Sequence, residues 1–174
     1  MMMWLRIFLV TSALALSGCA RSIETRINSA GQSNIEKSGF ILAPLDKSAS
    51  AELIAARDLV SAQLAQRGFN PSETGPYYLE VGVSSRPASI ALREAGKTIA
   101  TASPKRPSRK CLLKEYRVAV ALTRIADGET MYRASSGEFH CKAALANTLE
   151  PLVDHALADL GQPRGSYVIT AKVE

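Results

Sequence analysis

The chain has 174 residues, with 21 Lys and Arg against 16 Asp and Glu, which gives a formal net charge of +5 at pH 7. An excess of this size fits attraction to anionic lipids or polysaccharides, and it fits plain solubility equally well. The sequence carries no nucleic-acid-binding motif and no Gly-rich phosphate loop, so we expect no nucleic-acid partner and no nucleotide chemistry.

Residues 1–18 have the features of a secretion signal. A short segment with one positive charge, Arg6, precedes an apolar run over residues 7–16 that is too short to span a bilayer as a stable helix. The run ends in Leu16-Ser17-Gly18-Cys19, where an ordinary signal would end in a small-x-small cleavage site. These four residues resemble the lipobox of bacterial lipoproteins.

The lipobox resemblance implies that Cys19 is the lipid attachment site. A peptidase would cut before Cys19, and acylation of the new amine would complete an effectively permanent anchor of three acyl chains. In lipoproteins of Gram-negative bacteria, an Asp directly after the lipidated cysteine is a signal for retention in the inner membrane. This chain has Ala20 at that position, so the resemblance implies an outer-membrane protein whose domain faces the periplasm. The alternative is an ordinary signal peptide in which Cys19 is incidental.

The chain after the signal is long enough for one domain. Residues 19–38 are polar and lack a sustained apolar period, so they predict a flexible tether. We therefore assign residues 39–174 to a single domain. Its first predicted element is a short buried strand over residues 40–44, which Pro44 closes.

The next predicted element is an amphipathic helix that Ser48 or Ser50 caps. Apolar residues at spacings of three and four form its buried face. These are Leu53, Ala56, Val60 and Leu64. Gly68 followed by Phe69 is typical of a Schellman-type helix end, in which the glycine takes the left-handed conformation.

The alternation of apolar and polar residues over 77–83 predicts a half-buried strand. Residues 84–110 are predicted to form a variable basic loop or a small hairpin that turns near Gly96. Four cations in this segment form a candidate patch for an anionic polymer, and the alternative is a solvated loop. The four are Lys105, Arg106, Arg109 and Lys110.

The clearest hairpin joins a strand over residues 112–126 to a strand over residues 129–141 through Asp127-Gly128. Pairing about this turn brings Cys111 close to Cys141. Because two cysteines remain after Cys19 and an exported chain meets an oxidising compartment, we predict a disulfide between them. A metal site at Cys111, His140 and Cys141 is the alternative, but it lacks a fourth ligand, so we predict no metal and no cofactor.

A second amphipathic helix is predicted over residues 148–160, with Pro151 in its first turn and Gly161 at its end. His155 lies off the apolar stripe, which favours a solvated position over a catalytic base. Residues 167–173 alternate again and predict a final strand whose edge is available to a partner.

The order of these features is similar to a family of bacterial lipoproteins known only as a domain of unknown function. The resemblance covers residues 39–160 and rests on the lipobox, on Arg67-Gly68-Phe69, on Gly75-Pro76, on the strand and turn over residues 118–128 and on Met131-Tyr132-Arg133-Ala134. It implies the fold that the residues also indicate, an α+β domain in which two helices pack on one face of an antiparallel sheet of four to five strands. It implies no known reaction.

We therefore predict a non-catalytic, lipid-anchored envelope protein with a structural or binding role at the outer membrane. Neither His140 nor His155 lies near a Ser or Cys motif, and no paired carboxylates or metal ligands indicate an enzyme. The alternative is an auxiliary lipoprotein of an envelope transport or assembly complex, which would bind a partner protein or an anionic polysaccharide.

Overall fold

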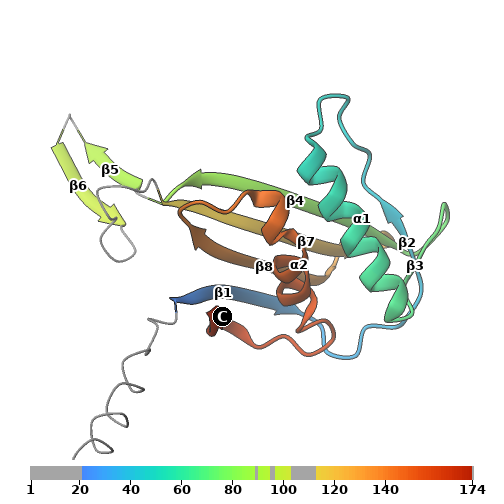
Figure 1. Cartoon of the computed structure of the whole chain (residues 1–174). Coiled ribbons are helices and arrows are strands. Elements are labelled where there is room, and N and C mark those ends of the chain that lie inside the picture. Colours follow the sequence, from blue (N-terminus) through green and yellow to red (C-terminus); the bar gives the residue numbers. More distant parts are fainter. Residues whose placement is uncertain (1–20, 89, 95–96, 103–112, 174) are drawn as a thin grey trace, which may run out of the picture.

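The computed structural model describes residues 21–88, 90–94, 97–102 and 113–173. A seven-stranded sheet forms the body of the molecule, and both helices lie on one of its faces (Figure 1). The strands are β1 (Arg21–Gly31), β2 (Gly39–Leu42), β3 (Asn70–Pro71), β4 (Tyr77–Pro87), β5 (Ile90–Glu94), β6 (Lys97–Ala102), β7 (Lys114–Arg124), β8 (Thr130–His140) and β9 (Gly165–Val173). The helices are α1 (Ala51–Gln66), α2 (Leu149–Leu157) and a short 3-10 turn over Leu145–Thr148.

The strand order in the main sheet is β3-β2-β4-β7-β8-β1-β9. The predicted antiparallel sheet of four to five strands is therefore wrong, although the α+β class is right. Strand β2 pairs in parallel with both β3 and β4, because α1 carries the chain back along the sheet between β2 and its neighbours. All the other pairings in this sheet are antiparallel, so the sheet is mixed.

Strand β1 corrects the predicted tether. Residues 21–31, which we assigned to a flexible segment, form an interior strand between β8 and β9. Only Ile27 among its inward-facing central residues is a large apolar residue, whereas Thr25 and Ser29 are buried through hydrogen bonds. Because this inward face is mostly polar, the sequence of β1 lacks the alternation of apolar and polar residues that predicts a strand. The folded domain thus begins before residue 39.

Helix α1 confirms the predicted caps. The side chain of Ser50 accepts a hydrogen bond from the backbone N–H of Leu53 at 3.2 Å. At the other end the N–H of Phe69 donates to the carbonyl of Leu64, and Gly68 has a φ of +91°. These two features are the Schellman arrangement that the sequence predicts.

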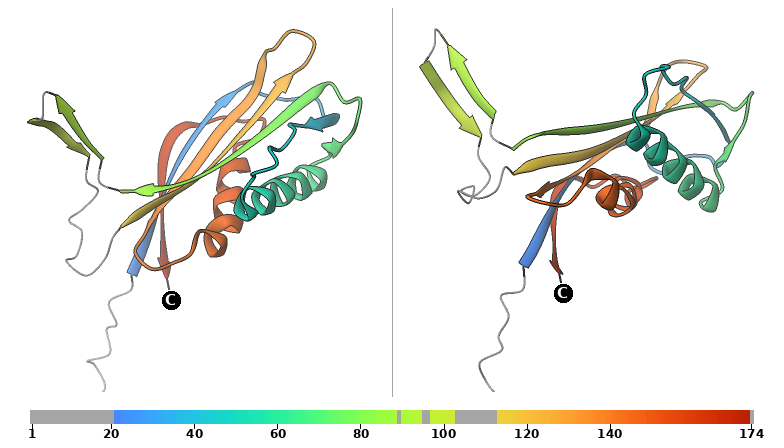
Figure 2. Two further views of the ribbon diagram at one scale, coloured as in Figure 1. Left: turned by 90° about the horizontal axis from the view of Figure 1, so that it is seen from above. Right: turned by 45° about the horizontal axis from the view of Figure 1, so that its top comes forward.

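The β7–β8 hairpin is also confirmed, and Gly128 in its turn has a φ of +73°. The predicted hairpin around Gly96 is present as a separate two-stranded sheet of β5 and β6, which projects beyond the ends of β4 and β7 (Figure 2). Helix α2 ends at Leu157, three residues earlier than predicted. The predicted final strand is β9, which lies at the edge of the main sheet next to β1.

The core lies between the two helices and the sheet face that they cover. Its largest fully buried apolar residues come from both layers. They are Phe40, Val60, Leu64, Leu79, Val118, Val120, Leu122, Tyr132, Leu152, Val153 and Leu157. The opposite sheet face carries no helix in the described part of the chain (Figure 2). We call it the open face.

Candidate functional site

Most of the residues singled out by sequence lie outside the described part of the structure. This holds for Cys19, for Cys111 and for the candidate patch. The patch residues are Lys105, Arg106, Arg109 and Lys110. Cys141 follows β8 directly, and its disulfide with Cys111 stays a prediction. The structure therefore directs attention to sites that sequence reasoning did not identify.

The two histidines lie on different elements but lie near the same buried carboxylate. His140 Nε2 is 2.8 Å from Glu138 Oε2, and Thr25 Oγ1 donates to Glu138 Oε1 at 2.6 Å. Burial alone would raise the pKa of Glu138, but the contacts with His140 and Thr25 outweigh it and, with a smaller contribution from His155, hold that pKa below its usual value. This cluster ties β1 to β8.

A second buried carboxylate, Asp159, follows α2. Ser29 donates to its Oδ2 at 2.6 Å, and Arg164 Nε and the Tyr167 hydroxyl donate to its Oδ1 at 2.6 and 3.0 Å. Burial again opposes the charge, yet these three donors keep the pKa of Asp159 below its usual value. The network joins β1, β9 and the end of α2, and its groups are all paired with one another.

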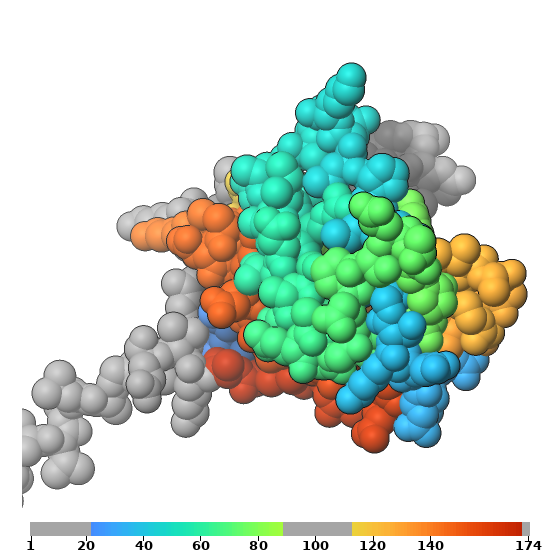
Figure 3. Space-filling model, turned by 90° about the vertical axis from the view of Figure 1, so that its right-hand side faces the viewer, coloured from blue at the N-terminus to red at the C-terminus, as the bar shows by residue number. Residues whose placement is uncertain are grey.

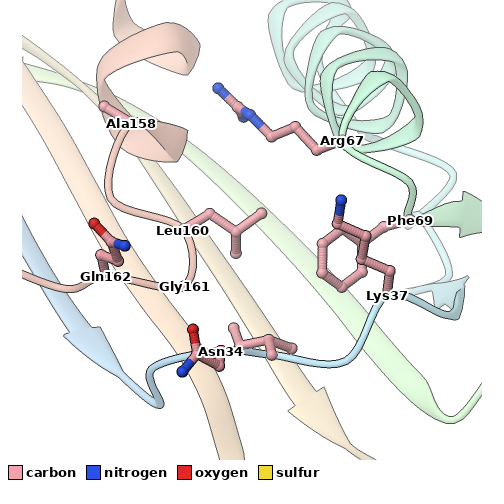
Figure 4. Close-up of a pocket in the computed structure, with 9 residues that line it drawn as sticks. Asn34, Lys37, Arg67, Phe69, Ala158, Leu160, Gly161 and Gln162 are labelled. Carbon is pink, nitrogen blue, oxygen red and sulfur yellow. The ribbon is translucent and has the colours of Figure 1, made fainter.

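An open cavity of about 430 Å³ lies at the end of the molecule where α1 and α2 terminate (Figure 4). We call it the two-cation cavity because Lys37 and Arg67 are the charged residues among those that line it. The other lining residues are Asn34, Ile35, Phe69, Ala158, Leu160, Gly161 and Gln162. Figure 3 views this end, where blue residues between β1 and β2 adjoin green residues that follow α1.

The local folds of three connections place the cations. Arg67 is the C-cap residue of α1, and the side chain of Lys37 packs against the adjacent Gly68, where an added Cβ would lie 3.0 Å from Lys37 Cδ. The third connection follows α2, and its Gly161 carbonyl accepts a hydrogen bond from the N–H of Asn34 at 3.1 Å. Asn34 itself has a φ of +62°, a left-handed conformation that Asn tolerates better than most residues.

The electrostatics of the two-cation cavity favour an anion. No carboxylate occurs among its described lining residues, and Arg67 Nη1 is buried without a hydrogen-bond acceptor in the described structure. A buried donor without an acceptor costs roughly 1–3 kcal/mol, which a ligand oxygen would recover. The amides of Asn34 and Gln162 add both donors and acceptors.

Sequence reasoning missed this cavity for identifiable reasons. Arg67 was interpreted only as the end of a helix, and Lys37 was assigned to the tether. The sequence offered little signal, because Arg67 is a single cation after the helix and Lys37 lies 14 residues before the helix begins, directly after Glu36. Only the fold brings these two residues to one opening.

The comparisons with known proteins place the fold but not the family. No known family and no curated protein matches the sequence. The similarity to a lipoprotein family of unknown function therefore stays a prediction.

Solved structures share the fold at low sequence identity. A single-residue variant of the PelC dodecamer from Paraburkholderia phytofirmans is 12% identical, with a TM-score of 0.51 over 80% of this chain and 98% of that chain. A second PelC dodecamer structure from this organism gives 10% identity and a TM-score of 0.50 over 80% and 99% of the two chains. A PDZ domain protein from Parabacteroides distasonis is 7% identical, with a TM-score of 0.59 over 87% of this chain and 39% of that chain.

Neither of the two α-helices in the described residues is long and apolar enough to cross a membrane.

Proposed function

We propose that this chain is a non-catalytic protein of the bacterial outer membrane, anchored by lipid on Cys19 and facing the periplasm. Its two-cation cavity binds an anionic unit of an envelope polysaccharide. The observation that carries the binding role is the cavity itself, which Lys37 and Arg67 both line without a carboxylate among the described lining residues. Its volume falls within the roughly 300–1,000 Å³ typical of small-molecule sites.

The direction of β1 supports the same function. The strand begins at Arg21, two residues after Cys19, and ends at Gly31, next to the connection that lines the two-cation cavity. Eleven residues of extended strand span about 35 Å. With lipid on Cys19, the sheet would therefore stand on the membrane and present the cavity to the periplasm.

Ligand binding tests the cavity. The full mature chain in detergent micelles is titrated calorimetrically with a galacturonate trisaccharide, a neutral cellotriose and inorganic phosphate. We expect the acidic trisaccharide to bind, and Lys37→Met or Arg67→Gln to weaken the binding by about tenfold, since each removes a charge-assisted hydrogen bond. Lys47→Met is the matched control, because Lys47 is exposed and lies outside the cavity.

Two results would contradict this role. Equal affinities for the acidic and the neutral trisaccharide would remove the argument from charge. Unchanged affinity in both Lys37→Met and Arg67→Gln would move any binding away from the cavity.

The anchor is tested separately by intact mass. Protein purified from membranes should match residues 19–174 plus three acyl chains. A Cys19→Ser variant should lose its association with membranes. An unlipidated mass that starts at another residue would instead indicate a processed periplasmic protein.

A subunit role in an envelope assembly is a second candidate. PelC, which shares the fold, forms a dodecamer, and the outer side of β9 is not paired with another described strand. Val168 on β9 is 56% exposed, so this edge offers an apolar side chain as well as backbone hydrogen-bonding groups. Light scattering of the purified protein tests the candidate, because a monomer at all concentrations up to about 100 μM would exclude a stable homo-oligomer of a typical micromolar affinity.

A further inference from the structure

The open face of the sheet carries a groove that is separate from the two-cation cavity. It has a volume of about 320 Å³, and Arg26 and Arg117 are the charged residues among those that line it. The other lining residues are Ile27, Asn28, Ser135, Ser166, Tyr167 and Val168. We call it the open-face groove. It lies across β7, β8, β1 and β9, on the face opposite the helices.

The strand register explains how the two arginines meet. Gly137 on β8 pairs with Arg117 on one side and with Arg26 on the other, so the arginines flank a residue without a side chain. The guanidinium of Arg26 is held over the ring of Phe139, 4.8 Å from its centroid. Arg117 Nη2 donates to Glu115 Oε1 at 2.7 Å. Both cations are therefore held in place by neighbours.

One buried nitrogen of the two arginines has no hydrogen-bond acceptor in the described structure. Arg117 Nε is buried and finds no hydrogen-bond partner among the described residues, although Arg117 also pairs with Glu115. The Arg117 side chain as a whole is 39% exposed, so the rest of its guanidinium can meet an oxygen placed in the groove. The described lining residues include no carboxylate, and Glu115, which accepts from Arg117 Nη2, also accepts from Arg86 Nε at 2.6 Å, so its charge is shared between two arginines.

The polar lining distinguishes between classes of anion. Ser135, Ser166 and Asn28 each supply donors and acceptors, and Asn28 Nδ2 already donates to Ser166 Oγ at 2.8 Å. A phosphate would use only donors, whereas a sugar hydroxyl uses donors and acceptors together. Two arginines beside such groups match a carboxylate with neighbouring hydroxyls.

We propose that the open-face groove is a second binding site, specific for an acidic saccharide whose carboxylate lies between Arg26 and Arg117 and whose hydroxyls contact Asn28, Ser135 and Ser166. This proposal rests on the proposed function for the class of ligand, but its residues and its face of the sheet are different. A negative binding result at either the groove or the cavity therefore does not decide whether the other one binds the ligand.

Gly137 allows a test that leaves every charge in place. A Cβ added at Gly137 would lie 3.5 Å from Glu115 Oε1 and 3.6 Å from Arg117 Nε, which are ordinary contact distances. Gly137→Ala should thus fold normally and place a methyl group beside Arg117, between the two arginines that line the groove. Gly82→Ala is the matched control, because Gly82 lies outside the groove and its Cβ would meet only Ala119 Cβ, at 3.9 Å.

Backbone NMR of the full mature chain in detergent micelles gives a separate readout for each site. On titration with the galacturonate trisaccharide, we expect the amides of Asn28, Ser135 and Gly137 to shift for the groove, and those of Gly68 and Gly161 to shift for the cavity. Gly137→Ala and Arg26→Gln should each weaken the groove response about fivefold, as loss of one hydrogen bond does, and leave the cavity response unchanged. Gly82→Ala and Arg67→Gln should leave the groove response intact.

Several outcomes would overturn the proposal. The proposal is wrong if the groove amides do not shift with the trisaccharide. It is also wrong if they shift equally with inorganic phosphate or with cellotriose. A groove response that Gly137→Ala and Arg26→Gln both leave unchanged would equally place the ligand elsewhere. If only the cavity amides fail to shift, the proposed function is contradicted, but the proposal of a binding site in the groove is not.

Discussion

Two carboxylates are buried on the helix-covered face, and residues distant in sequence hold each of them. Glu138 is 5% exposed and contacts Thr25 and His140, while Asp159 is 2% exposed and contacts Ser29 and Arg164. Both Thr25 and Ser29 belong to β1. The charged groups therefore fix the position of a strand that has few apolar side chains of its own.

Glu138→Gln should reduce stability in a pH-dependent way. The pKa of Glu138 lies below its usual 4.5 in the folded protein, so the charged form stabilises the fold above the unfolded pKa, and this contribution is lost as the pH falls through the folded pKa. At pH 7 we expect the variant to lose about 1–3 kcal/mol in urea unfolding, and we expect the difference from wild type to shrink below about pH 4. The exposed Glu80→Gln is the control, and a pH-independent difference would contradict the argument.

Gly31 and Gly128 allow a matched test of backbone constraint. Gly31 has a φ of +141°, and an added Cβ would lie 2.3 Å from the carbonyl oxygen of Met131, whereas Gly128 has a φ of +73° with nothing within 4 Å. Gly31→Ala should therefore cost more than about 2 kcal/mol, because backbone must move, and Gly128→Ala only about 1 kcal/mol. Thermal unfolding measures both, and equal losses would show that the close approach of β1 to β8 relaxes easily.

The elements differ in how far the sequence predicts them, and β1 and β7 show why. Val118, Val120 and Leu122 alternate with less buried residues on β7, so period-two patterning predicts that strand and its hairpin. Strand β1 buries Thr25 and Ser29, whose partners Glu138 and Asp159 are more than 100 residues away, so no local pattern reveals it. The parallel pairing of β2 is equally non-local, because it depends on where α1 returns the chain.

The candidate sites also depend on non-local contacts that no local sequence pattern reveals. Arg67 is predicted as a helix end, but its position in one cavity with Lys37 depends on the connection between β1 and β2. Arg26 and Arg117 come together only through the register of β1, β8 and β7. A sequence pattern finds the residues of an element, whereas these sites are formed between elements.

The predicted disulfide belongs to the ends of β7 and β8. Lys114, three residues after Cys111 in the sequence, pairs with His140, the neighbour of Cys141. The oxidised protein should show no free thiol in denaturant, and two should appear after reduction. Closure of a loop of about 30 residues should contribute roughly 3–4 kcal/mol, which reduction removes. Two free thiols before reduction would exclude the bridge.

At the scale of the whole molecule, β1 relates the proposed anchor to the two proposed binding sites. Its first residue lies two positions after Cys19, and the chain between the proposed lipid and the sheet is therefore too short to act as a long tether. The two-cation cavity lies at the far end of β1, and the open-face groove lies along its middle, at Arg26 and Asn28. A saccharide chain rising from the membrane along the open face would meet the groove before the cavity.

This orientation can be measured with tryptophan, because the single tryptophan of the chain is Trp4, in the segment predicted to be removed. Ser22 lies at the start of β1, Ser33 lies two residues beyond its end at Gly31, and both are exposed, so Ser22→Trp and Ser33→Trp place one fluorophore near each end of the strand. In vesicles that contain brominated lipids, the tryptophan at position 22 should be quenched strongly. The tryptophan at position 33, near the far end of a strand that spans about 35 Å, should not be quenched. If neither tryptophan is quenched, the domain is held away from the membrane by a flexible tether. If the tryptophan at position 33 is quenched more strongly, the opposite end of β1 faces the membrane and the cavity lies against it.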